Sequence, residues 1–147
     1  MIWRNHTITR LAHLCFQTNR FDEMTAFYRD TLGLPIKFSL RLPDDRIFGH
    51  YFVLGDNSFL ELFDAAGACE MWGGTPGSRS PTPGQTYQHF CLEVEGIADV
   101  RRTIIEAGCD VTDITKGMDG SLQAWIKDPD GNDIELMEYT RDSLQLA

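Results

Sequence analysis

The sequence contains no long apolar run, few cysteines and a deficit of basic residues. No uninterrupted apolar stretch approaches the roughly 18–20 residues needed to span a bilayer, and Met1–Arg10 contains no apolar signal-peptide core. The four cysteines include no CxxC pair, which argues against a disulfide scaffold. Thirteen basic against 22 acidic side chains give a formal charge of −9, which argues against a nucleic-acid partner. We therefore expect a soluble cytoplasmic protein that binds neither nucleic acid nor a membrane.

The sequence also lacks the signatures of two large enzyme classes. It contains no GxGxxG or other phosphate-binding loop, and no GxSxG nucleophile elbow. Apolar residues make up 42% of the chain, enough for a packed core and too many for a disordered chain. A length of 147 residues suits one ordinary domain or two small fused modules.

A Gly- and Pro-rich segment divides the chain near its middle. Residues 73–86 read GGTPGSRSPTPGQT, a composition that propagates neither a helix nor a central strand. The sequences on its two sides repeat one pattern: His-Leu-Cys-Phe from His13 reappears as His-Phe-Cys-Leu from His89, and Glu-Leu-Phe from Glu61 as Glu-Leu-Met from Glu135. The two histidines are 76 residues apart and the two glutamates 74, so the chain is predicted to contain two similar halves.

Each half has the pattern of a β-α-β-β-β module. An amphipathic helix follows the first strand and ends near Gly33 in one half and Gly108 in the other, where a left-handed C-cap is expected. Strand-like runs bounded by turn signals follow each helix. These runs cover residues 35–42, 47–54 and 58–63 in the first half and 110–115, 121–127 and 133–139 in the second.

The fold class predicted from this pattern is α+β. The chain, residues 1–147, is expected to form a single domain in which module 1, at about residues 8–65, and module 2, at about 87–140, are joined by a linker at 73–86. A four-stranded sheet with a helix on one face leaves its other face bare. Two curled mixed sheets facing each other would cover those faces and enclose a cleft.

Strand alternation places one histidine and one glutamate of each half on the inner wall of this cleft. The four residues are His13, Glu61, His89 and Glu135. Two imidazoles and two carboxylates crowded in a partly apolar space cost free energy unless a cation neutralises them. A divalent metal relieves this cost and gives a ligand set of two nitrogens and two oxygens, with room for water. A single histidine on a strand is more often a hydrogen-bonded structural residue, so the hypothesis depends on the repetition.

Other candidate residues are interpreted as structural. His50 lies in an apolar strand, where we expect a hydrogen-bonded wall residue rather than a catalytic one. Cys15 and Cys91 share the strand face of the two site histidines and are interpreted as small buried fillers. Cys69 and Cys109 are assigned to loops.

These features together resemble the vicinal-oxygen-chelate superfamily, and within it most closely the glyoxalase I branch. The resemblance rests on the paired modules, on the His and Glu of each, and on the DPDGN turn at residues 128–132 that precedes Ile-Glu-Leu at 134–136. It also includes the helix end FYRDTLGL at residues 27–34 and extends from about Ile8 to Tyr139. The resemblance implies a metal-dependent lyase or isomerase with a metal-centred cleft, which acts on a small molecule and forms a homodimer.

In the glyoxalase I pattern the metal ligands are His, Glu, His and Glu, which correspond here to His13, Glu61, His89 and Glu135. The resemblance implies one divalent metal ion per site (zinc, nickel, cobalt, manganese or iron) that chelates adjacent oxygens of the substrate. A carboxylate then moves a proton on a carbon next to a carbonyl. By this likeness Glu135 is the catalytic base and Glu61 is its partner for proton return.

Two positions depart from the pattern of the short glyoxalases that use glutathione. Gln17 stands where these enzymes carry an arginine, and Ala65 where they carry an asparagine, so the residues that hold the glutathione tail are missing. Two alternatives to the lyase or isomerase remain open. One is a non-haem iron dioxygenase, against which a fourth protein ligand argues. The other is a non-catalytic drug-binding resistance protein, whose relatives typically lack the ligand residues.

Overall fold

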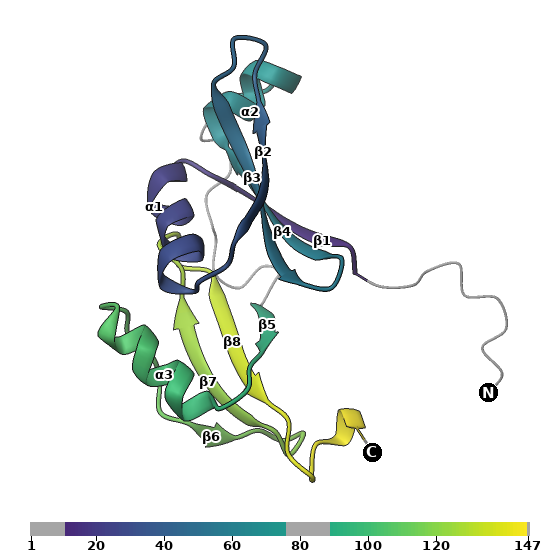
Figure 1. Ribbon diagram of the computed structural model, residues 1–147, viewed down its shortest axis with the longest axis vertical. Coiled ribbons are helices and arrows are strands. Elements are labelled where there is room, and N and C mark those ends of the chain that lie inside the picture. Colours follow the sequence, from purple (N-terminus) through teal and green to yellow (C-terminus); the bar gives the residue numbers. More distant parts are fainter. Residues whose placement is uncertain (1–10, 76–88, 147) are drawn as a thin grey trace, which may run out of the picture. The chain divides into compact units, whose positions relative to one another are not determined.

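The structure is a computed structural model that describes residues 11–75 and 89–146 (Figure 1). The chain divides into two compact units, residues 1–78 and 79–147. Each unit contains a four-stranded mixed sheet together with helices, so the fold class is α+β, as predicted. The predicted linker lies outside the described residues from position 76 onward.

The first unit follows the β-α-β-β-β order and adds a second helix. Its sheet has the strand order β1-β4-β3-β2, in which β1 runs parallel to β4 and the other pairs are antiparallel. The first helix continues as a π-helical turn that ends at Thr31, shortly before Gly33, whose φ of 69° is left-handed. The elements are β1 (His13–Thr18), α1 (Phe21–Ala26), the π-helical turn (Phe27–Thr31), β2 (Ile36–Arg41), β3 (Ile47–Gly55), β4 (Ser58–Asp64) and α2 (Ala65–Trp72).

The second unit repeats this topology. Its sheet has the order β5-β8-β7-β6, with β5 parallel to β8 and the other pairs antiparallel. Its helix ends before Gly108, whose φ of 90° is again left-handed, as the sequence predicted. The elements are β5 (His89–Glu93), α3 (Ile97–Glu106), β6 (Thr115–Lys116), β7 (Leu122–Lys127), β8 (Asp133–Glu138) and a short 3-10 helix (Leu144–Leu146).

The strand predicted at residues 110–115 is wrong for most of its length, because β6 contains only Thr115–Lys116. In the preceding segment one backbone bond to β7 is present, from the Thr112 N–H to the Trp125 carbonyl oxygen at 3.0 Å, and side chains make further bonds to the backbone. The Arg101 guanidinium donates to the carbonyl oxygen of Thr112 at 2.7 Å, and the Thr112 hydroxyl accepts the backbone N–H of Trp125 at 2.9 Å. These bonds replace part of a regular strand ladder, so the pairing begins late.

The prediction that Cys69 lies in a loop is also wrong, because it lies within helix α2. The Asp64 carboxylate caps this helix by accepting the backbone N–H of Gly67 at 2.8 Å. The helix packs tightly on β3, since a Cβ at Gly67 would lie 2.4 Å from the Cβ of Phe48. The sequence pattern had assigned no element to this segment.

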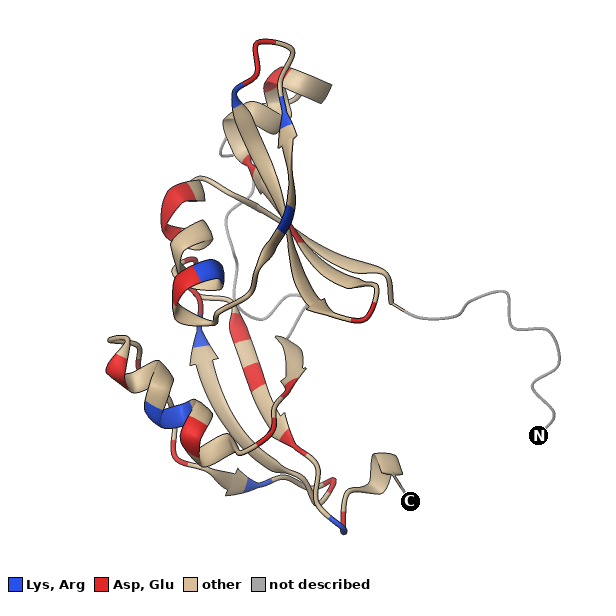
Figure 2. Cartoon of the chain, in the orientation of Figure 1, with Lys and Arg blue, Asp and Glu red and all other residues tan. Residues whose placement is uncertain are grey.

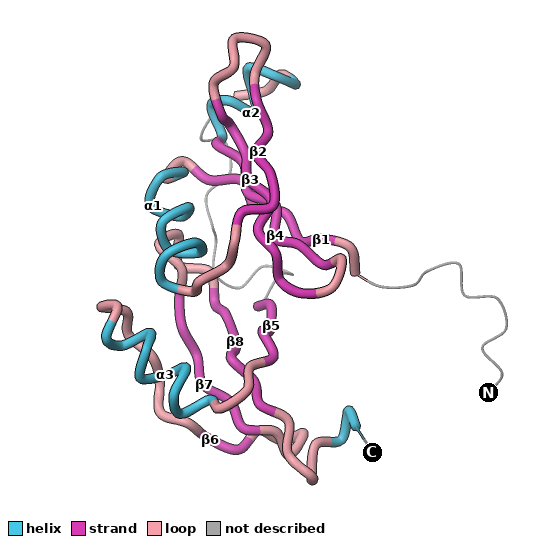
Figure 3. Tube along the Cα trace, in the orientation of Figure 1, coloured by secondary structure: helices cyan, strands magenta, loops and turns pink. Residues whose placement is uncertain are grey.

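Each unit buries one face of its sheet beneath a helix (Figure 3). In the first unit α1 contacts β4, and Tyr28 lies 5.8 Å from Phe52 between ring centroids. In the second unit α3 contacts β7 and β8. The side chains that fill these interfaces are apolar and buried: Met24, Tyr28, Phe52, Leu60 and Leu62 in the first unit, and Ile97, Ile104, Ala124, Ile126, Ile134 and Leu136 in the second. The sheet face opposite each helix carries the candidate site residues, and we call it the site face.

Within the described parts of the chain, no helix is long and apolar enough to cross a membrane.

Candidate metal centre

The structure brings His13 and Glu61 together within the first unit. The two residues lie on adjacent parallel strands, where Glu61 is the register partner of Cys15, two residues after His13. Side chains two residues apart on a strand share a face, so the imidazole and the carboxylate meet diagonally. The His13 Nε2 lies 3.3 Å from the Glu61 Oε2, and the carboxylate is largely buried.

The second unit repeats this arrangement with His89 and Glu135. Glu135 is the register partner of Cys91, and the His89 Nε2 lies 3.2 Å from the Glu135 Oε2. Acidic residues recur along β8, the strand that carries Glu135 (Figure 2). The same ring nitrogen thus faces the same carboxylate oxygen in both units, at nearly the same distance.

An aromatic ring lies beside each His–Glu pair. Tyr51 on β3 is the register partner of Glu61, and its ring meets that of His13 edge-on with centroids 5.7 Å apart. Trp125 on β7 is the register partner of Glu135, and its centroid lies 4.8 Å from that of His89, again edge-on. These contacts restrict the orientation of both imidazoles.

From the sequence, Tyr51 and Trp125 are expected only as core or pocket-wall residues, although a signal for a paired role beside the site histidines is present. Tyr51 and Trp125 are 74 residues apart, the same spacing as the two glutamates.

The two units differ in the hydrogen bonding of the carboxylate. Burial raises the pKa of Tyr51 to about 12, and a hydrogen bond to Glu61 together with the charge of that carboxylate contributes. The tyrosine hydroxyl therefore stays protonated at neutral pH and donates to Glu61. Among the described residues, no corresponding bond joins Trp125 to Glu135.

Cys15 and Cys91 differ from the prediction that they are buried fillers, because both are exposed in the structure. Neighbouring side chains still shield their thiols in part. This shielding and the adjacent carboxylates raise the pKa of each thiol to about 12, with Glu61 beside Cys15 and Glu135 beside Cys91. Both cysteines thus stay as uncharged thiols at neutral pH.

The DPDGN turn sets where β8 begins. The buried Asp128 carboxylate accepts the backbone N–H groups of Asp130 at 3.0 Å and Asn132 at 2.9 Å, and the Asn132 side-chain amide at 2.8 Å. Gly131 in this turn has a φ of 83°, which a glycine adopts without steric cost. The turn fixes the register between β7 and β8 and so places Glu135 on the site face.

His50 lies on the opposite, helix-covered side of the first sheet. Its Nδ1 is 2.9 Å from the Ser39 hydroxyl, and its ring stacks on Phe21 with centroids 5.0 Å apart. Burial and, to a smaller extent, the charge of Arg29 lower the pKa of His50 below its usual value. His50 is therefore a hydrogen-bonded wall residue, as predicted from the sequence.

The predicted ligands form two pairs, one in each unit. Within residues 11–75 and 89–146, no group of three or more His, Cys, Asp or Glu side chains is close enough to hold a metal ion. In chemical terms the pairs fit a divalent metal, because each supplies one imidazole nitrogen and one carboxylate oxygen on the same face.

The fold and the repeated pairs agree with the comparison to known families. The chain belongs to the Glyoxalase/Bleomycin resistance protein/Dioxygenase superfamily, whose family model matches residues 10–136. This confirms the superfamily predicted from the sequence.

Solved structures of this fold include both enzymes and a binding protein. The chain is similar to lactoylglutathione lyase from Agrobacterium tumefaciens, with 23% identity over 90% of this chain and 96% of that one, and a TM-score of 0.64. It is also similar to the trypanothione-dependent glyoxalase I of Leishmania major, with 21% identity, coverage of 89% and 87%, and a TM-score of 0.64. A third similar structure is TnmS3, an antibiotic binding protein from Streptomyces sp. CB03234, with 19% identity, coverage of 92% and 100%, and a TM-score of 0.66.

The TM-scores show a shared fold, and at identities below 25% the similarity shows the fold alone. Comparison with curated proteins gives no significant match.

Proposed function

We propose that this protein is a metal-dependent lyase or isomerase that moves a proton on a carbon next to a carbonyl of a small oxygenated substrate. The observation that carries the proposal is the repetition of one His–Glu pair in each unit, with nitrogen–oxygen distances of 3.3 and 3.2 Å. A single pair of this kind is common in proteins as a structural contact. Two equivalent pairs on equivalent strands match the donor set of one divalent metal.

His13, Glu61, His89 and Glu135 would hold the metal. When bound, the metal would act as a Lewis acid on adjacent oxygens of the substrate. The two histidines are held edge-on by Tyr51 and Trp125, so each imidazole is oriented before a ligand arrives.

The hydrogen bonding of the two glutamates supports a division of roles between them. Glu61 is more deeply buried than Glu135, with a side-chain exposure of 9% against 15%, and it accepts a hydrogen bond from Tyr51. A carboxylate held in this way is suited to remain a fixed ligand. Each glutamate also lies beside a cysteine thiol, but Glu135 has no tyrosine partner in the described residues and is the better candidate for the general base that takes the proton.

The test combines metal analysis with a measurement of proton exchange. Protein purified without chelator should contain about one divalent ion per chain, that is, one ion for every two His–Glu pairs. His13→Ala and His89→Ala should each lose this ion. His50→Gln serves as the control, because His50 lies on the other side of the sheet, and it should keep the metal.

The second part of the test follows exchange of the α-protons of hydroxyacetone with deuterated water by NMR. Glu135→Gln should abolish this exchange and keep part of the metal affinity. Absence of metal from the native protein, together with unchanged exchange in Glu135→Gln, would overturn the proposal.

The alternatives give different results in the same test. An iron dioxygenase would consume oxygen with catechols and lose activity as its iron oxidises. A non-catalytic resistance protein would bind an apolar drug without any metal. The predicted homodimer and the predicted cytoplasmic location stay predictions.

A mixing experiment addresses how the four ligands come together. A variant that lacks His13 and Glu61 is combined with one that lacks His89 and Glu135. Metal binding restored in the mixture would place the ligands in a site shared by two chains of a dimer. No restoration would place them within one chain.

A further inference from the structure

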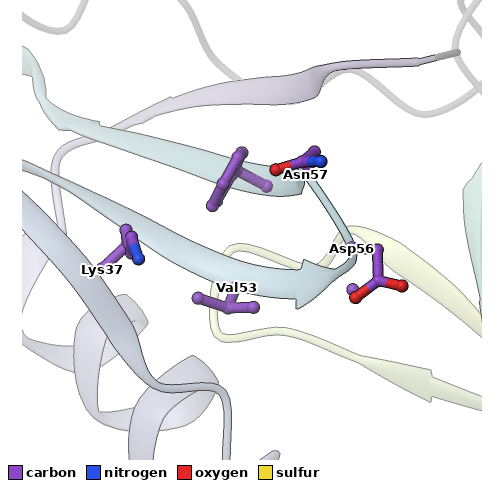
Figure 4. A pocket seen from close by; sticks show the side chains of 6 residues that line it. Lys37, Val53, Asp56 and Asn57 are labelled. Atoms are coloured by element: carbon purple, nitrogen blue, oxygen red, sulfur yellow. The ribbon is translucent and has the colours of Figure 1, made fainter. Parts of the chain in front are cut away.

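A pocket of about 440 Å³ lies in the first unit at the end of the β3–β4 hairpin (Figure 4). Its lining residues come from β2, β3, β4 and the turn: Lys37, Val53, Gly55, Asp56, Asn57 and Phe59. The volume is within the range of small-molecule sites, about 300–1,000 Å³. Nothing in the proposed metal chemistry uses this pocket.

The pocket lies on the site face of the sheet, next to the His–Glu pair. Phe59 is the register partner of His13 on one side and of Val53 on the other. It is also two residues before Glu61 on the same strand, a separation of about 7 Å along the site face. An elongated molecule could therefore reach from the His13–Glu61 pair across Phe59 into the pocket.

A β-bulge directs Lys37 into the pocket. Ile36 pairs with Phe52 on the helix-covered face, and Phe38 pairs with Tyr51 and stacks on its ring at 4.5 Å. The extra residue lets both Lys37 and Phe38 reach the site face, which regular alternation would not allow. Bulges commonly redirect a side chain beside a functional site.

Lys37 is also the lysine with no ion pair in the described part of the chain. Lys116 is paired with Asp142 at 2.6 Å, and Lys127 is paired with Asp133. Asp56 lies at the other end of the pocket from Lys37 (Figure 4). The pocket thus offers a positive end, an apolar middle and a negative end, so a bound anion would lie at the Lys37 end.

We propose that this pocket binds the far end of the substrate, and that this end is a short apolar group that carries a carboxylate, with the carboxylate on Lys37. Val53 and Phe59 contact the apolar part. Asn57 also lines the pocket, at the hairpin turn, and its backbone φ of 55° lies in the left-handed region. This inference rests on the proposed function, and it assigns the class of substrate as small oxygenated carboxylates.

The experiment titrates the full-length chain, without added metal, with phenylacetate and with its neutral counterpart phenylacetamide. Backbone amide shifts of an isotope-labelled sample locate the binding. Phenylacetate should perturb Lys37 and residues 53–59, and Lys37→Met should weaken its binding about three- to tenfold. Phenylacetamide should bind the natural sequence and the Lys37→Met variant with the same weak affinity.

Three matched variants complete the test. Lys37→Arg keeps the charge and should restore phenylacetate binding. Lys116→Met removes a paired lysine elsewhere and should bind as the natural sequence does. Asp56→Asn removes the negative charge at the other end of the pocket, and this variant should bind phenylacetate at least as tightly as the natural sequence does.

Equal affinity of Lys37→Met and the natural sequence for phenylacetate would overturn the proposal, as would shifts confined to other residues. Because the titration needs neither metal nor turnover, it separates the two proposals. If the Glu135→Gln variant binds phenylacetate normally and still exchanges the α-protons of hydroxyacetone at the natural rate, only the proposed function is contradicted. If the protein binds metal and exchanges the α-protons as proposed, but its phenylacetate binding does not depend on Lys37, only the pocket proposal is contradicted.

Discussion

Tyr51 and Trp125 occupy equivalent positions in the two units, and each is the register partner of its unit's glutamate. Both rings also meet the neighbouring histidine edge-on. The tyrosine has a hydroxyl that donates to Glu61, whereas no bond joins Trp125 to Glu135 in the described residues. One substitution between otherwise matching positions therefore gives the two carboxylates different surroundings.

Removal of the Tyr51 hydroxyl should weaken metal binding. Tyr51→Phe keeps the ring beside His13 but takes away the donor that orients Glu61. Because groups that orient a metal ligand typically contribute 10- to 100-fold in affinity, we expect a loss of about tenfold. Competition between the protein and a chromogenic chelator for cobalt measures this change.

Trp125→Phe is the matched control for this prediction. It also keeps an aromatic ring beside a site histidine and removes no hydrogen bond to a carboxylate, so cobalt affinity should change little. Equal losses in the two variants would show that the rings act by packing and that the hydroxyl has no separate role.

His50 should make the protein less stable in mild acid. Its pKa is lowered in the folded state by burial and then by the charge of Arg29. The folded protein therefore binds fewer protons than the unfolded chain, and its stability falls as the pH drops below the ordinary value of 6.5. Above that value the contribution of His50 is fully present.

Urea unfolding at pH 7.5 and at pH 5.0 tests this sign. His50→Phe keeps a ring that can stack on Phe21 and cannot be protonated. The variant should lose less stability between the two pH values than the natural sequence. The same loss in both proteins would assign the acid sensitivity to other groups.

Gly67 is required by close packing rather than by backbone conformation. Alanine normally stabilises a helix by about 1 kcal/mol relative to glycine. At this position, however, a Cβ would lie 2.4 Å from the Cβ of Phe48, so α2 must move away from β3. We expect a net loss of about 1–2 kcal/mol in Gly67→Ala.

The neighbouring exposed residue provides the control. Ala66→Gly in the same helix should cost about 0.5–1 kcal/mol from helix propensity alone. Urea unfolding measures both variants. A Gly67→Ala protein more stable than the natural one would mean that α2 does not pack on Phe48 as described.

Local patterns were sufficient for most of the elements. Alternation of apolar residues predicted the long strands, and Gly33 and Gly108 ended the two helices because both adopt a positive φ. The prediction failed at residues 110–115, where Arg101 bonds the backbone from a helix that precedes it in the sequence. It also missed α2, which has few strong local signals and depends on the Asp64 cap and on contact with Phe48.

The sequence by itself determined the duplication, the α+β class and the identity of the His and Glu candidates, because residue spacing and strand period are properties of the chain. Tertiary structure decided which atoms meet. Strand register places the imidazole nitrogens of His13 and His89 at 3.3 and 3.2 Å from their glutamates. It also gives Glu61 a tyrosine partner that Glu135 lacks, and a bulge in β2 turns Lys37 toward the site face. Register and bulges depend on pairing between strands that are distant in sequence, so no local pattern could specify them.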